Sequence, residues 1–189
     1  MLSRFPGYSN AKEIAITVVG RIEEAKHGHY GYLRNQYYKR KIEQTTEAVG
    51  SDPWVGGRSI VNSSTVIGDN IYFGGLHVHR EGRVTIGDNF HSGSGCDIRT
   101  ENYDYEGDAL PYDESFVRKP VSIGDNVWIG TDVTVIPGVS IGEGAIVQSG
   151  SVVTHDIPNG AIAGGHPAKV FDHRNMEHYE RLKAEGKFD

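Results

Sequence analysis

The chain has little cysteine and no long apolar run, and each shortage excludes a class of protein. Its single cysteine, Cys96, cannot form an internal disulfide, so the sequence predicts a reducing compartment. No stretch reaches the roughly 18 apolar residues that a membrane-spanning helix needs. The first segment, MLSRFPGYSNAKE, lacks the apolar core of a signal peptide. We therefore expect a cytoplasmic protein with no membrane partner.

Positive charge is also scarce. The 25 Asp and Glu side chains outnumber the 19 Lys and Arg side chains, and the net charge is -6. A protein that holds nucleic acid through its phosphates needs the opposite balance, so no nucleic-acid partner is expected. A length of 189 residues corresponds to one domain, or to one domain with appendages.

Glycine is abundant, with 25 residues, and much of it follows a six-residue repeat. From Ile123 the chain divides into IGDNVW, IGTDVT, VIPGVS, IGEGAI, VQSGSV and VTHDIP. The first place of every unit is Ile or Val, and the fifth place is small or aliphatic. A period of six fits a short strand followed by a tight turn, and it fits neither a helix nor a simple alternating strand. Because one unit cannot bury its own apolar side chains, the units must stack.

The same repeat begins upstream and is interrupted once. Units open at Ile67 and Ile86, and from Ile98 the next start in phase would be residue 104. The pattern resumes only at Ile123. The chain at about 100–120 is therefore expected to leave the stack as a projecting loop, and long loops often carry function.

These segments resemble the hexapeptide-repeat acyltransferases, in particular the sugar O-acetyltransferase and antibiotic acetyltransferase branches. The resemblance rests on IGDNVWIG, GVSIGEGAIVQSGSVVTHDIP and AIAGGHPAKVF, and it covers roughly residues 59–172. It implies an all-β fold, a left-handed parallel β-helix with three sixes per turn, assembled as a homotrimer. It also implies that acetyl-CoA is a co-substrate, bound in the groove between subunits, and that the projecting loop helps to form the acceptor site.

The two ends of the chain predict short helical appendages. We expect an N-terminal helical cap segment over residues 1–58, the β-helix with its projecting loop over 59–165, and a C-terminal tail with a short helix over 166–189. The helical candidates are residues 9–28, 34–50 and 175–186. These segments are polar and amphipathic, so we expect them to cap the open ends of the stack.

By the same resemblance, one set of residues is expected to hold acetyl-CoA: Trp128, Gly130, Thr131, Ser149, Gly150, Thr154, His155 and Lys169. The first five would follow the pantetheine arm, and the next two would lie near the pyrophosphate. Lys169 would face the adenosine phosphate. Coenzyme A is strongly anionic, which favours a ligand role for Lys169 over a solvated surface charge.

Acetyl transfer from a thioester to a hydroxyl needs both substrates side by side and a base for the hydroxyl proton. In the resembling family a histidine just before the loop is catalytic. Counted from Ile86, its place is Tyr103, and a shifted alignment that matches NYD puts Glu101 there. A phenol is a poor base at neutral pH, and an exposed carboxylate is a weak one. The pattern of the binding fold is intact, whereas the catalytic position is altered.

Other side chains are candidates for the base. His77 and His79 alternate with Leu76 and Val78, so both histidines are expected to face outward just before the loop. The alternative is that they are surface or subunit-contact histidines. In either case, Tyr103 can orient the acceptor through its hydroxyl group.

The acceptor site and the lone thiol complete the set of candidates. His91 is a further possible base, and with Asp104 and Asp108 it is expected to bind the acceptor. Cys96 occupies a fifth, inward place of its unit. A buried structural thiol is therefore expected there, and not a nucleophile.

The leading interpretation is an acetyl-CoA-dependent O-acetyltransferase that acts on a hydroxyl of a sugar or related small molecule, with reduced activity or an atypical base and no metal. A general base contributes about 100- to 10,000-fold, so its loss need not abolish transfer. One alternative is a catalytically impaired CoA-binding scaffold trimer. Another is a zinc site between subunits with His77 and His79 as ligands, because one branch of left-handed β-helix proteins holds zinc in this way.

Overall fold

The computed structural model describes residues 28 and 30–188. The chain divides into two compact units, Met1–Arg34 and Asn35–Asp189, and the second unit contains the repeats. A helix covers residues 30–45, which confirms most of the helical candidate at 34–50. The candidate at 9–28 lies, except for its last residue, outside the described residues.

Three sheets of short parallel strands follow this helix. The five-stranded sheet contains β1 (Ala48–Val49), β3 (Thr65–Ile67), β6 (Val84–Ile86), β11 (Val121–Ile123) and β14 (Ser140–Ile141). The seven-stranded sheet contains β2 (Trp54–Val55), β4 (Tyr72–Phe73), β7 (His91–Ser92), β12 (Trp128–Ile129), β15 (Ile146–Val147), β17 (Ala161–Gly165) and β18 (Ala168–His173). The four-stranded sheet contains β5 (Leu76–His79), β8 (Cys96–Arg99), β13 (Thr134–Val135) and β16 (Val152–Val153).

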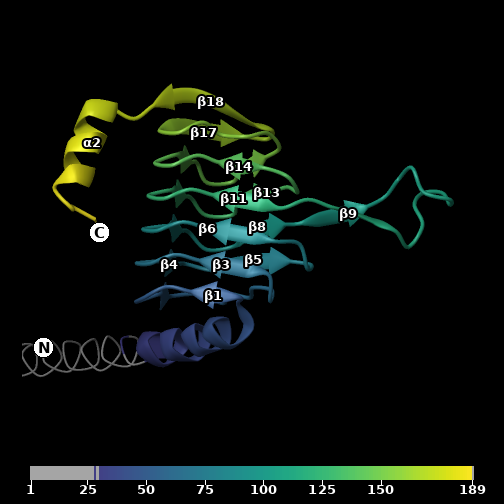
Figure 1. The fold of residues 1–189 in the computed structure, drawn as a ribbon, viewed down its shortest axis with the longest axis horizontal. Coiled ribbons are helices and arrows are strands. Elements are labelled where there is room, and N and C mark those ends of the chain that lie inside the picture. Colours follow the sequence, from purple (N-terminus) through teal and green to yellow (C-terminus); the bar gives the residue numbers. More distant parts are fainter. Residues whose placement is uncertain (1–27, 29, 189) are drawn as a thin grey trace, which may run out of the picture. The chain divides into compact units, whose positions relative to one another are not determined.

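Successive strands join the three sheets in turn, so three sixes make one coil. Each strand pairs in parallel with the equivalent strand one coil further along, as Ile67 does with Ile86 and Ile86 with Ile123. Figure 1 shows the coils stacked on one another. This is the predicted left-handed parallel β-helix. Only the last pair of the seven-stranded sheet, β17 and β18, is antiparallel, and it ends the stack.

The inward places of the repeat form a continuous apolar core. Phe73 and Phe90 are fully buried and meet edge to face with ring centroids 5.9 Å apart. Cys96 is buried as predicted, with its Sγ 3.0 Å from the carbonyl oxygen of Gly130. Burial raises the pKa of this thiol, which disfavours the thiolate that a nucleophile requires.

The β-helix begins earlier than the expected boundary after residue 58. β1 and β2 lie in the segment expected to be a cap, yet they pair in parallel with β3 and β4. The segment AVGSDPWV lacks the IGDN motif, so its repeat is hidden in the sequence. The part of the preceding helix within the second unit still covers this first coil, because Ile42 is buried and the Asn35 side chain accepts a hydrogen bond from the Val55 amide (2.8 Å).

One corner of the β-helix carries a ladder of asparagine side chains. Asn70, Asn89 and Asn126 occupy the fourth place of the IGDN units with φ near 55°, a left-handed conformation that asparagine tolerates. The Nδ2 group of each donates to the next member of the ladder at 2.9 Å, and Asn126 donates to the Tyr179 hydroxyl of α2 (Met176–Ala184). At the same corner of the next coil, Gly144 makes room, since a Cβ there would lie 3.0 Å from the Tyr179 ring.

The predicted projecting loop is confirmed as a hairpin of β9 (Glu101–Tyr103) and β10 (Phe116–Arg118) (Figure 1). Its root is fixed by Glu101, whose side chain is 5% exposed and accepts a hydrogen bond from Arg118 Nε at 2.8 Å. The C-terminal helical candidate is also confirmed, as α2. None of the helices among residues 28 and 30–188 has the length and apolar character of a membrane span.

Candidate functional site

The outer face of the four-stranded sheet carries a row of polar side chains, which includes the predicted His77. His77 on β5 and Asp97 on β8 are register partners, and Thr134 on β13 continues the row. His79 lies two residues beyond His77 on the same face. Leu76 and Val78 are buried, so the expected outward direction of both histidines is confirmed.

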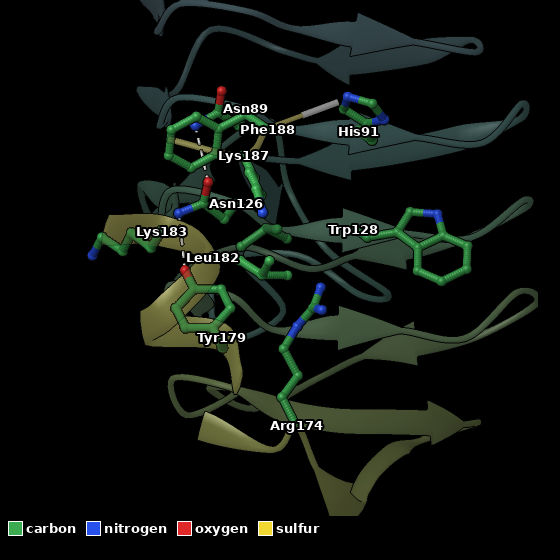
Figure 2. Close-up of a pocket in the computed structure, with 11 residues that line it drawn as sticks. Asn89, His91, Asn126, Trp128, Arg174, Tyr179, Leu182, Lys183, Lys187 and Phe188 are labelled. Carbon is green, nitrogen blue, oxygen red and sulfur yellow. Dashed lines mark hydrogen bonds between the residues drawn. The ribbon is translucent and has the colours of Figure 1, made fainter. Parts of the chain in front are cut away.

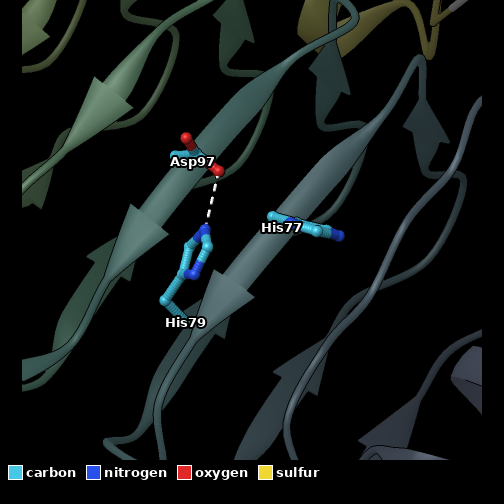
Figure 3. Close-up of side chains that lie close together, drawn as sticks. All are labelled: His77, His79 and Asp97. Atoms are coloured by element: carbon cyan, nitrogen blue, oxygen red, sulfur yellow. Dashed lines mark hydrogen bonds and ion pairs between the residues drawn. The ribbon is translucent and has the colours of Figure 1, made fainter.

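His79 and Asp97 form a hydrogen-bonded pair. His79 Nε2 lies 2.8 Å from Asp97 Oδ1, and the two side chains are 43% and 36% exposed (Figure 3). When a carboxylate accepts the proton of one ring nitrogen, the other nitrogen of a neutral imidazole carries the lone pair. Such a pair is an oriented base that solvent and small molecules can reach.

His77 differs from His79 in its surroundings. Its pKa is lowered by burial first and then by the nearby His79 and Arg58, so the neutral ring is favoured. Its Nε2 atom is buried and has no hydrogen-bond partner among the described residues. In Figure 3 the His77 ring extends away from the pair formed by His79 and Asp97.

The side chains of His77, His79 and Asp97 are also close enough together to be ligands of a metal ion. Ligand atoms of His77, His79 and Asp97 lie within 4.8 Å of one another. Zinc needs N and O donors at about 2.0–2.2 Å, in a roughly tetrahedral arrangement. The hydrogen bond between His79 and Asp97 engages one ligand atom of each residue, so an ion that used these two atoms would have to replace it.

Tyr103 and Glu101 lie in the hairpin and are held there by neighbours. The Tyr103 ring stacks on Tyr112 with centroids 4.1 Å apart, and Phe116 lies 4.6 Å away. The guanidinium group of Arg80 lies 5.8 Å from the Tyr103 ring centroid. The predicted place of the family histidine, Tyr103, is thus part of an aromatic cluster, and the Glu101 carboxylate is paired with arginine as described above.

The hairpin root and the histidine pair are physically connected. Thr100 is fully buried, and its hydroxyl donates to the backbone carbonyl of His79 at 2.8 Å. The Thr100 carbonyl in turn accepts from the Lys119 amide at 2.9 Å, where the chain returns to the stack. The loop therefore leaves the coil directly beside the pair.

The two predicted acceptor aspartates lie in the outer part of the hairpin. Asp104 accepts a hydrogen bond from the Glu106 amide at 3.0 Å, and the Asp108 amide donates to Asp113 at 2.8 Å. Sequence reasoning missed Asp113, which organises this tip. Hydrogen bonds from Ser115 and from the Asp108 amide lower the pKa of Asp113. The short spacing in DES was the available signal, since Asp and Ser often bond to nearby backbone in turns.

Three of the predicted donor residues meet at the corner between the seven-stranded and four-stranded sheets. The Thr131 amide donates to Ser149 Oγ at 3.0 Å, and Thr131, Ser149 and Gly150 are all exposed. Gly130 lets the two coils approach, because a Cβ there would lie 2.5 Å from the Ser149 nitrogen. This donor corner lies three residues before Thr134, on the edge of the face that carries Asp97.

The remaining donor candidates are more widely spread. Thr154 Oγ1 lies 2.8 Å from Nδ1 of its neighbour His155, near the end of the stack. Lys169 is exposed on β18, opposite Gly164 in the antiparallel pair. Trp128 is 54% exposed on the outer face of the seven-stranded sheet, so it does not share the face of the histidine pair.

Trp128 belongs to an outward row that includes Trp54, Tyr72 and His91. The Tyr72 and His91 rings have centroids 5.5 Å apart. A cavity of about 410 Å³ adjoins the row at Trp54, Tyr72 and His91. His91, predicted for the acceptor site, is therefore separated within one chain from His79, and the spacing of the repeat gave no sign of this separation.

Comparisons with known proteins agree with the fold and with the motifs. Residues 120–155 match the family described as "Bacterial transferase hexapeptide (six repeats)". Galactoside O-acetyltransferase of Escherichia coli is 31% identical over 150 residues, which are 78% of this chain and 72% of that protein. YJL218W of Saccharomyces cerevisiae is 40% identical over 109 residues, so the match spans 57% of this chain and about half (55%) of that relative.

Two solved structures extend the comparison. A galactoside acetyltransferase in complex with coenzyme A superposes with a TM-score of 0.64 and 32% identity, covering 75% of this chain and 70% of that one. A maltose O-acetyltransferase from Clostridium difficile 630 superposes with a TM-score of 0.63 and 30% identity, covering 80% and 87%. The chain belongs to the hexapeptide-repeat acyltransferase family.

Proposed function

We propose that the protein is an acetyl-CoA-dependent O-acetyltransferase whose acceptor is a hydroxyl group of a sugar or related small molecule. The observation that carries this proposal is the 31% identity to galactoside O-acetyltransferase over 78% of the chain. Coenzyme A in a solved relative supports acetyl-CoA as the co-substrate. In keeping with the family resemblance, we expect a cytoplasmic homotrimer in which the donor groove lies between subunits.

We further propose that His79, oriented by Asp97, is the base in place of the missing family histidine. The pair lies on the face between the donor corner of Thr131 and the root of the hairpin, with 43% of the His79 side chain exposed. The hydrogen bond at 2.8 Å engages Nε2 and leaves Nδ1 as the proton acceptor.

Transfer of the acetyl group from coenzyme A to the acceptor needs no covalent enzyme intermediate. The acceptor hydroxyl oxygen attacks the thioester carbonyl carbon while its proton passes to His79 Nδ1. A new C–O ester bond forms and the C–S bond breaks, with its electron pair leaving on sulfur. The imidazolium then returns the proton to the coenzyme A thiolate, which restores the neutral ring.

Tyr103 has a supporting role in this proposal. It lies in the aromatic cluster of the hairpin, 38% exposed, where its hydroxyl can orient an acceptor. Asp104 and Asp108 remain candidates for contacts with acceptor hydroxyls, and His91 for contacts on the other sheet. These assignments follow from family position and loop location.

Turnover is tested by incubating the protein with acetyl-CoA and a panel that includes galactosides and maltose. Release of free thiol and the mass of an O-acetylated product are measured. We expect His79→Ala to lower kcat by about 100- to 10,000-fold with little change in KM for acetyl-CoA. Asp97→Asn is expected to lower kcat by at least about tenfold, because an amide does not fix the same tautomer.

Ser122→Ala is the matched control. Ser122 lies on the outer face of the five-stranded sheet, and among the described contacts its hydroxyl bonds only to the Ser140 hydroxyl (3.0 Å), so loss of the hydroxyl should leave turnover unchanged. Tyr103→His restores the family residue and should raise the rate of the His79→Ala variant. Bound coenzyme A with no thiol release across the panel would instead support the scaffold alternative, and retained zinc abolished by His79→Ala would support the metal alternative.

A further inference from the structure

A cavity of about 530 Å³ lies between one corner of the β-helix and the C-terminal segment (Figure 2). β7 and β12 contribute His91 and Trp128 to one wall. α2 and the residues after it contribute Leu182 and Phe188, and Arg174 precedes α2. A volume of this size is typical of small-molecule sites.

The cavity is cationic although the protein as a whole is acidic. Arg174, Lys183 and Lys187 line it, and no Asp or Glu is among the described residues that do so. The net charge of the chain is -6, so this local balance runs against the average. A concave site lined by one sign of charge concentrates ligands of the other sign.

The three cations differ in how far they are already neutralised. Lys183 pairs with Glu143, and Figure 2 shows its ammonium group pointing away from the cavity. Lys187 pairs with the partly exposed Glu185 at 2.7 Å. Arg174 donates through Nε to the Gly144 carbonyl at 2.6 Å and makes no ion pair with any carboxylate of residues 30–188.

Figure 2 shows the Arg174 guanidinium and the Lys187 ammonium directed into the cavity from different sides. A guanidinium group binds phosphate or carboxylate oxygens through two parallel donors. Trp128 (54% exposed) and Phe188 (48% exposed) present ring surfaces on opposite sides of these cations in Figure 2. The site thus offers cationic groups with an aromatic ring surface beside them.

We propose that this cavity binds a small molecule that joins an anionic phosphate or carboxylate group to a sugar or similar ring. Arg174 and Lys187 bind the anionic oxygens, and the Trp128 indole contacts the ring. The inference does not require acetyl transfer. Two sources share this chemistry: a separate ligand that carries an acid group, and the phosphates of coenzyme A itself.

Binding is measured by titration calorimetry and by the fluorescence of Trp128 in a Trp54→Phe background. The probes are inorganic phosphate, glucose, glucose 6-phosphate and coenzyme A. We expect glucose 6-phosphate to bind more tightly than glucose by roughly tenfold or more and to weaken with added salt. The double variant Arg174→Gln/Lys187→Gln should lose this preference.

The control double variant is Lys39→Gln/Arg40→Gln, which removes the same two residue types from a helix that contributes nothing to the cavity. Arg174 also contacts α2, with its guanidinium 5.7 Å from the Tyr179 ring centroid. Arg174→Lys therefore serves as a second variant that keeps the charge, and circular dichroism of each variant checks that α2 is retained.

The possible outcomes distinguish a separate acidic ligand from coenzyme A, and one set of outcomes overturns the proposal. If the double variant loses glucose 6-phosphate and keeps coenzyme A, the cavity takes a separate acidic ligand. If both are lost together and compete with each other, the cavity takes the phosphates of coenzyme A. If no probe binds, or if the cavity and control variants bind all probes alike, the proposal is wrong. None of these results depends on turnover, so they are distinguishable from failure of the acetyltransferase proposal.

Discussion

The outer faces of the four-stranded and seven-stranded sheets share one apolar core and carry different chemistry. On the four-stranded sheet, His79 and Asp97 bond to each other beside the root of the hairpin. On the seven-stranded sheet, Tyr72 and Trp128 belong to an aromatic row that borders two cavities. The repeat dictates what points inward, whereas the outward places are free to diverge. Functional side chains in such a fold are therefore expected at the outward places of the strands, which alternate with the buried ones.

The largest expected effect comes from damage to the core that both faces share. Phe73→Ala removes a fully buried ring that packs on Phe90, and we expect a loss of about 3–5 kcal/mol in the free energy of unfolding. Both faces should unfold together in one cooperative transition. Denaturant unfolding followed by fluorescence and circular dichroism measures this, and separate transitions would contradict a single core.

A smaller effect should fall on the four-stranded face alone. Among the described residues, Arg118→Ala leaves the buried Glu101 carboxylate with Arg80, 3.8 Å away, as its one cationic partner, so we expect a loss of about 1–3 kcal/mol at the hairpin root. Hydrogen exchange should speed up in β9 and β10 and stay unchanged in β7 and β12. Arg83→Ala, which removes an exposed pair with Glu47, is the control and should cost under about 1 kcal/mol.

A comparable but weaker change should fall on the corner that carries α2. Tyr179→Phe removes the bonds to Asn126 and Glu143, and we expect a loss of about 1 kcal/mol. Burial, assisted by the bond to Glu143, raises the pKa of Tyr179 from 10.0 to about 12. The unfolded chain therefore releases this proton first, and stability should fall as pH rises from about 10 towards 12. The Phe variant should lose that part of the pH dependence.

The smallest expected effect concerns His77. Its pKa is lowered mainly by burial, so the unfolded chain takes up a proton on acidification before the folded protein does. This contribution to stability is complete above the ordinary value of 6.5 and is lost as pH falls below it. His77→Gln should flatten unfolding curves measured through this window. An equally steep curve in the variant would assign the dependence to other groups.

The architecture could be predicted from the sequence because the period of six leaves little choice. The inward aliphatics, the projecting loop and the C-terminal helix all follow from repeat phase and local composition. The first coil escaped prediction, since AVGSDPWV keeps the strand spacing without the IGDN signature. The bond from His79 to Asp97 also escaped, because it joins two coils and depends on register across the sheet.

The cationic cavity was hidden for a related reason. Trp128 comes from a strand, whereas Arg174 and Lys187 come from a tail that the repeat does not govern. A single substitution in the pattern did offer a clue. The fourth place reads Asn in each IGDN unit and Gly144 in IGEG, and that gap is where the Tyr179 ring fits.

The hydrogen bonds of the asparagine ladder all run in one direction along the β-helix. Every asparagine side chain in it donates its hydrogen bond to a residue further along the sequence. Asn126 donates to the Tyr179 hydroxyl, which in turn donates to the anionic Glu143. A carboxylate at the receiving end polarises the whole series in one sense. Shortening the chain before Tyr179 would leave the Asn126 side-chain amide without this hydrogen-bond acceptor. The C-terminal helix thus ends the ladder of side chains, whereas the β-helix itself continues beyond Asn126 through β14.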